Sequence, residues 1–135
     1  MAFIEWRASL SVGVAAMDQQ HQQLIALINQ LADAMTQGKS KVALGGILDE
    51  LVHYTVYHFA DEEKLLAQRH YPELSTHQSD HIQLTTQVAD YQSQFRAGKL
   101  ALSFDLMNFL RDWLANHIQI SDKKYGVFLN QHGVF

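Results

Sequence analysis

Apolar side chains recur at intervals of three and four residues over most of this 135-residue sequence, and only seven glycines and one proline interrupt them. This interval matches the 3.6-residue turn of an α-helix and not the two-residue alternation of a half-buried strand. A helix with one apolar face has to bury that face against a neighbour. The sequence therefore predicts an all-α fold built from amphipathic helices.

Helix start and stop signals divide the pattern into four segments. Asp18, Ser40 and Ser103 each precede an apolar stripe and carry the short polar side chains that are preferred at N-caps. A glycine or the single proline follows each of the first three stripes and stops the helix there. The segments expected to be helical are 18–38, 40–72, 72–98 and 103–120.

Four such helices joined by short connections bury their apolar faces most simply as an up-down-up-down antiparallel four-helix bundle. We expect residues 18–125 to form this bundle in a single domain that covers residues 1–135. Residues 1–17, which include Trp6 and show no sustained period, are expected to form an N-terminal arm along the outside. Residues 126–135 are expected to form a C-terminal tail.

Composition excludes several classes of function. The formal net charge of -4 provides no basic surface for nucleic acid or for an anionic membrane. The absence of cysteine excludes disulfides, iron–sulfur clusters and thiolate zinc sites. The first twenty residues contain no uninterrupted apolar run of the kind found in signal peptides or membrane spans, so we expect a cytoplasmic protein.

Five histidines and two carboxylates form a candidate set of metal ligands. In an antiparallel bundle all seven fall at one end, and the first six lie in phase with the apolar stripe of their own helix. One transition-metal ion rarely takes more than about four to six protein ligands, so the set predicts two ions. Imidazole and carboxylate donors leave iron, manganese and zinc open. The candidate ligands are His21, His58, Glu62, His77, His81, His117 and Asp122.

The spacing within the set suggests how the ions are shared. His58 and Glu62 are four residues apart, so both side chains point to the same cluster. His117 and Asp122 are five apart, which on an ideal helix separates them by about 140°. That pair requires a helix distortion or a bridging ion that the aspartate meets from the side. Because a carboxylate has two oxygens, we expect Glu62 and Asp122 to bridge and the five histidines to be terminal ligands.

A single histidine on an apolar face is more often structural than a ligand. Seven such groups together are different, because each buried polar group without a partner costs about 1–3 kcal/mol. Three further histidines, His53, His70 and His132, lie off the ligand face and are expected to be surface or structural residues. Glu50 and His53 form one E-x-x-H unit, but the second copy that ferritin-like diiron enzymes use is absent.

Four sequence blocks carry a resemblance to a known family. They are Asp18-Gln19-Gln20-His21, His58-Phe59-Ala60-Asp61-Glu62-Glu63, His77-x-x-x-His81, and Trp113-Leu114-Ala115-Asn116-His117-Ile118 followed by Asp122 and Tyr125. In this order they resemble the signature blocks of the hemerythrins. Trp6 and Val12-Gly13-Val14 are similar to the arm of the single-domain bacterial branch, the bacteriohemerythrins. The resemblance covers almost the whole chain.

The resemblance implies two non-haem irons bridged by Glu62, Asp122 and a solvent-derived oxygen. His77, His81 and His117 would complete one iron, while His21 and His58 would hold the other and leave a coordination position open for dioxygen. A tight apolar pocket would then protect the bound gas from protons. The residues expected to line this oxygen pocket are Leu24, Phe59, Trp113 and Leu114.

The function implied by the resemblance is reversible dioxygen binding, for storage or for delivery to an oxygen-consuming enzyme. On this interpretation the protein is a monomer and not an enzyme. Two alternatives stay open, because a fold does not determine function. One is an oxygen or redox sensor, although this sequence carries no signalling domain. The other is a diiron enzyme that reduces peroxide or nitric oxide, which would need a proton route and an electron donor.

Overall fold

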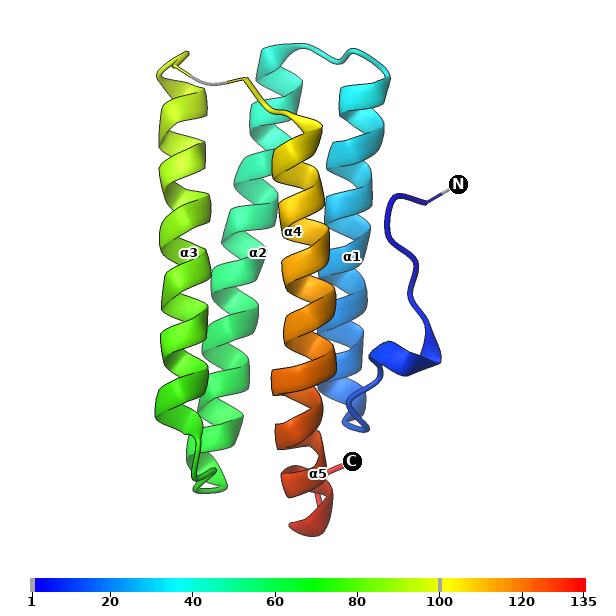
Figure 1. Ribbon diagram of the computed structural model, residues 1–135, viewed down its shortest axis with the longest axis vertical. Helices are drawn as coiled ribbons and strands as arrows, with labels where there is room; N and C mark the ends of the chain where they lie inside the picture. The colour runs from blue at the N-terminus through cyan, green and yellow to red at the C-terminus, as the bar shows by residue number, and fades with distance from the viewer. Residues whose placement is uncertain (1, 100) are drawn as a thin grey trace.

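A computed structural model of the chain describes residues 2–99 and 101–135, and all of its regular elements are helical. Figure 1 shows the long helices side by side, with the N-terminal segment running along the outside. The elements are the short helix η1 (Ala8–Leu10), α1 (Ala15–Thr36), α2 (Lys41–Gln68), α3 (Leu74–Arg96), α4 (Phe104–His117), the π-helical segment η2 (Ile118–Asp122) and α5 (Lys123–Gln131).

The four long helices alternate in direction and form an up-down-up-down bundle, which confirms the predicted all-α fold (Figure 1). α1 packs against α2 and α4, and α2 packs against α3. Each helix contributes its apolar stripe to one continuous core, which also takes in residues of the arm. Among the described residues no helix combines the length and the hydropathy needed to cross a bilayer.

Two of the three predicted N-caps are present in the structure, and the third is not. The Ser40 side chain accepts a hydrogen bond from the Ala43 amide, and the Ser103 side chain caps α4 in the same way. The prediction for Asp18 was wrong, because α1 begins at Ala15, one turn earlier. Alanine is a strong helix former and extends the helix upstream.

The Asp18 carboxylate instead ties down the N-terminal arm. Its two oxygens accept hydrogen bonds from the Ser11 hydroxyl at 2.6 Å and from the Val12 amide at 2.8 Å. Further along the arm, Asn29 exchanges two hydrogen bonds with the backbone of Ile4, at 2.8 and 2.9 Å. The arm is therefore fixed at two points along α1.

The segment 126–135, expected as a tail, is helical as far as Gln131, where α5 ends. The apolar residues there explain the difference, because Tyr125 and Leu129 are fully buried against the bundle end. At Gly126 the arm passes so close that a Cβ atom would meet the Val12 carbonyl. Only glycine allows this approach between the arm and α5.

The close contact at Gly126 gives a test of the packing. We expect Gly126→Ala to lower the free energy of unfolding by about 1–3 kcal/mol, because the added methyl group forces the arm away from α5. Gly46→Ala is the matched control, since Gly46 lies exposed within α2 and an added Cβ meets nothing within 4 Å. The control should raise the free energy of unfolding by about 0.5–1 kcal/mol in urea titrations. Equal effects of the two substitutions would contradict the described contact.

Candidate metal centre

All seven candidate ligands come together in one buried layer, near the end of the bundle at which α1 and α3 begin. Their side chains fall into two groups, in each of which one donor atom per residue lies within 4.8 Å of the others. Even the most exposed of the seven, His117, is only 8% exposed. The first group is Glu62, His77, His81, His117 and Asp122, and the second is His21, His58 and Glu62.

Each helix of the bundle supplies candidate ligands from the end that lies in this layer. α1 supplies His21 near its start, and α2 supplies His58 and Glu62 from its later half. α3 supplies two histidines from its first turns. The last donors lie at the end of α4 and of the segment η2 that follows it.

The π-helical segment explains how His117 and Asp122, which are five residues apart, reach the same layer. A π-helical turn closes hydrogen bonds from i to i+5, so residues five apart lie on the same face. His117 Nε2 is accordingly 3.1 Å from Asp122 Oδ1. Of the two explanations that the sequence left open, the helix distortion is the one present in the structure.

The Glu62 carboxylate faces both groups of histidines. Its Oε1 atom lies 2.6 Å from His77 Nε2 and 3.2 Å from His81 Nε2. Its Oε2 atom lies 3.2 Å from His58 Nε2 and 3.5 Å from His21 Nε2. One oxygen therefore belongs to each group, as a carboxylate that bridges two cations requires.

Asp122, at the end of η2, repeats this arrangement. Its Oδ1 atom lies 3.2 Å from His77 Nε2 and 3.1 Å from His117 Nε2, while Oδ2 lies 3.1 Å from His21 Nε2. Two ligands at right angles on one ion, each about 2.1 Å from it, are about 3.0 Å apart. The separations around Asp122 are close to that value, and those around Glu62 run from 2.6 to 3.5 Å.

Several buried polar atoms in this layer lack the partner that a cation would provide. Both ring nitrogens of His21 and the Oδ1 atom of Asp122 make no hydrogen bond to any described residue. His81 Nε2 and His117 Nε2 also face each other at 3.2 Å, where at most one proton fits between two neutral rings. Imidazole and carboxylate donors suit iron, manganese and zinc. The residues present therefore fit a pair of such cations.

Three hydrogen bonds with neighbouring side chains orient the candidate metal ligands. The Nδ1 atom of His58 lies 2.7 Å from Gln20 Oε1, and that of His81 lies 2.9 Å from Glu63 Oε2. The Tyr125 hydroxyl donates to Glu62 Oε2 at 2.8 Å. Such partners fix the tautomer of a ligating imidazole and aim its other nitrogen at the metal. These contacts were not predicted from the sequence.

The carboxylates and imidazoles of the layer shift one another's pKa values. Burial lowers the pKa of His21, but the adjacent carboxylates of Asp122 and Glu62 outweigh burial and raise it to about 9. The same balance raises the pKa of His77 to about 10. Burial alone would raise the pKa values of Glu62 and Asp122, yet the surrounding imidazoles hold both below their usual range. Without a cation, the layer therefore holds protons on His21 and His77.

The three histidines that the sequence placed outside the site lie outside it in the structure. His53, His70 and His132 are all exposed and belong to neither group of donors. His70 adopts a left-handed conformation with φ of 57° in the turn after α2. The Nδ1 atom of His132 pairs with the Phe128 carbonyl at 2.8 Å.

An apolar cavity of about 30 Å³ adjoins the histidine layer inside the bundle. The four residues expected to line an oxygen pocket, Leu24, Phe59, Trp113 and Leu114, all line this cavity. Phe59 stacks on His81 with ring centroids 3.7 Å apart, and Trp113 stacks on His117 at 4.4 Å. Two residues that line the cavity are therefore in direct contact with candidate ligands. The residues that were not predicted to line it are Ile28, Leu51, Thr55, Leu84, Val88 and Leu110.

Comparison with known families decides what kind of domain this is. Residues 12–129 match the family model described as the hemerythrin HHE cation binding domain. The chain belongs to the hemerythrin family. The match includes every helix of the bundle and all seven candidate ligands.

Individual hemerythrins resemble the chain over nearly its whole length. It is 36% identical over 132 residues to a bacteriohemerythrin of Stenotrophomonas maltophilia, covering 98% of this chain and 85% of that protein. It is 35% identical to the bacteriohemerythrin of Methylococcus capsulatus, covering 96% and 99%. A solved structure of a wild-type hemerythrin superimposes with a TM-score of 0.89 at 35% identity, covering 93% of this chain and 96% of that one.

The shifted pKa values predict how the metal-free hemerythrin responds to pH. Protonated His21 and His77 stabilise the fold fully below about pH 6.5, the unfolded pKa of histidine. This stabilisation is lost as the pH rises through the folded values of about 9 and 10. We therefore expect the free energy of unfolding of chelator-treated protein to fall between about pH 6.5 and pH 9.5. Urea titrations across this range measure it.

Metal affinity should change in the opposite direction over the same range, because imidazoles ligate only when deprotonated. His53→Gln is the matched control, since His53 is exposed and lies outside both groups of donors. That variant should keep the wild-type pH profile. A metal-free protein whose stability is constant or rises from pH 6.5 to pH 9.5 would contradict the described ion pairs.

Proposed function

We propose that this hemerythrin binds dioxygen reversibly at two non-haem irons, for storage or for delivery to an oxygen-consuming enzyme. The observation that carries the proposal is the unequal division of the histidines around two shared carboxylates. Three imidazoles surround one side of Glu62 and Asp122, and two surround the other side. The side with fewer donors leaves room for an exogenous ligand.

In this proposal His77, His81 and His117 hold one iron, and His21 and His58 hold the other. Glu62 and Asp122 would each offer one carboxylate oxygen to each ion. When bound, a pair of ferrous ions supplies two electrons that dioxygen can accept and return. The protein's own part is to keep both ions in place and to exclude water and protons from the gas.

The cavity beside the donors supports binding over reduction of dioxygen. Its lining is apolar or aromatic apart from Thr55, whose hydroxyl donates to the Leu51 carbonyl at 2.7 Å. No carboxyl group or uncommitted hydroxyl therefore lines the cavity among the described residues. Reduction of peroxide or nitric oxide consumes protons, and this lining provides no group to deliver them. A non-enzymatic role in a monomeric, cytoplasmic protein is part of the same proposal.

Oxygen titration of the iron-loaded, reduced protein tests the proposal. We expect uptake of about one dioxygen for every two irons, since only the side with two histidines leaves room for an exogenous ligand, and we expect full release under vacuum. The absorption spectrum with and without air follows both steps, and metal analysis of the same sample gives the iron content.

A zinc-loaded sample is the control, because zinc has no redox chemistry and should take up no oxygen. Irreversible uptake, with hydrogen peroxide or water as the product, would contradict a carrier role and favour the enzymatic alternative. Uptake at one dioxygen for each iron would contradict a shared centre.

A further inference from the structure

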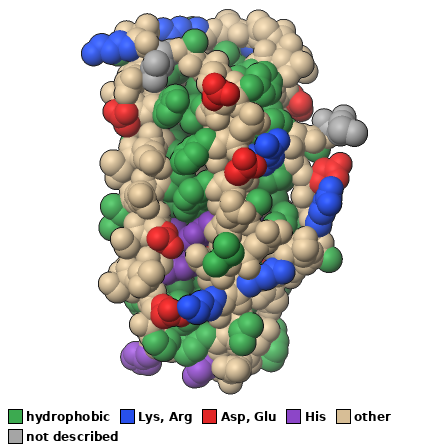
Figure 2. Space-filling view, viewed as in Figure 1, with side chains coloured by type: hydrophobic (Ala, Val, Ile, Leu, Met, Phe, Trp, Pro, Cys, Tyr) green, Lys and Arg blue, Asp and Glu red, His purple; other side chains and the backbone are tan. Residues whose placement is uncertain are grey.

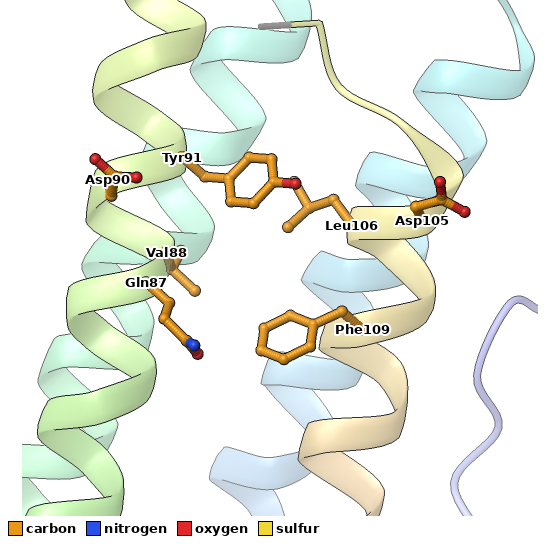
Figure 3. A pocket seen from close by; sticks show the side chains of 7 residues that line it. All are labelled: Gln87, Val88, Asp90, Tyr91, Asp105, Leu106 and Phe109. Atoms are coloured by element: carbon orange, nitrogen blue, oxygen red, sulfur yellow. The ribbon is translucent and has the colours of Figure 1, made fainter.

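A groove of about 320 Å³ runs along the side of the bundle between α3 and α4. It exists because the backbones of α3 and α4 approach each other less closely than those of the other neighbouring helices. Figure 3 shows Tyr91 reaching from α3 toward Leu106 of α4, and Phe109 reaching from α4 toward α3. Apolar side chains are visible along this groove in the space-filling view (Figure 2).

The groove and the buried cavity meet at Val88. This side chain lines both of them and is only 5% exposed. On α4 the two spaces are also neighbours, because Leu106 lines the groove and Leu110, one turn later, lines the cavity. Val88 is therefore the lining residue that the solvent-open groove shares with the apolar cavity near the candidate ligands.

Two other depressions near the site are less suited to admit an apolar molecule. One lies between α2 and α3 and shares Phe59 with the cavity. The Phe59 ring is stacked on His81 at 3.7 Å with an interplanar angle of 2°. This stacked ring blocks access to the cavity from that side. The other lies at His77, is lined mainly by polar side chains, and shares no lining residue with the cavity.

We propose that small apolar gas molecules reach the cavity through the groove between α3 and α4, and that Val88 sets the rate of their passage. A valine in a helix has one strongly preferred rotamer, so passage requires a brief excursion of Val88 or a slight separation of the two helices. Dioxygen as the gas rests on the proposed function, but the route itself needs no metal.

Quenching of Trp113 fluorescence by dissolved oxygen tests the route without iron. Trp113 lines the cavity, and Trp6→Phe removes the other tryptophan of the chain. The full chain is used with excess zinc, which has no redox chemistry. Because packed interiors leave few voids larger than water, we expect Val88→Phe to lower the oxygen quenching constant about twofold or more, and Val88→Ala to raise it.

Two controls separate passage through the interior from access at the surface. Iodide, a charged quencher, reports only the exposed edge of Trp113 and should quench all variants equally. Ala60→Phe fills the depression between α2 and α3 and should leave oxygen quenching unchanged. The route is overturned if Ala60→Phe lowers oxygen quenching and Val88→Phe does not, or if neither Val88 variant changes it.

In the iron-loaded protein, Val88→Phe should slow oxygen association and dissociation by the same factor. The equilibrium affinity should stay unchanged, because a barrier on the path alters neither end state. If the quenching results are as expected but oxygen does not bind reversibly, the carrier function is contradicted and the route is still supported. Reversible binding with unchanged rates and unchanged quenching in both Val88 variants would remove the route and keep the carrier function.

Discussion

Two buried carboxylates hold together the end of this bundle that carries the candidate metal ligands. Each turns one oxygen toward a group of two histidines and the other oxygen toward a group of three. Fully buried charges are tolerated only when they are paired. The carboxylates of Glu62 and Asp122 therefore need the surrounding imidazoles as partners, just as a bound metal would need them as ligands. All four helices must therefore meet in one register at this layer, and the remaining length of the bundle supplies the apolar core that keeps them there.

The π-helical segment is the local helix distortion that this register requires. It lets Asp122 face the same layer as His117, although an ideal helix would turn the two apart. It also turns Tyr125, three residues later, inward, where its hydroxyl reaches Glu62. Burial and the neighbouring carboxylate raise the pKa of Tyr125 well above its usual value, so the hydroxyl stays a hydrogen-bond donor. Irregular turns of this kind are frequent at functional sites.

The fold and the donor set were predictable because both follow from spacing. Helical periodicity placed six of the candidate ligands in phase with the apolar stripes, and an antiparallel arrangement then placed all seven at one end. Contacts that depend on side-chain conformation were not predictable in this way. Gln20 and Glu63 adjoin ligands in sequence, yet each pairs with a histidine on a helix other than its own. Asp18 has the composition of an N-cap but serves the arm, because two alanines extend α1 past it.

Anomalous diffraction at the iron absorption edge, measured on crystals of the iron-loaded protein, gives the position of the iron directly. We expect two peaks within about 4 Å of each other, separated by the carboxylates of Glu62 and Asp122. One peak should lie among His77, His81 and His117, and the other beside His21 and His58. A single peak, or iron bound outside this layer, would contradict this arrangement.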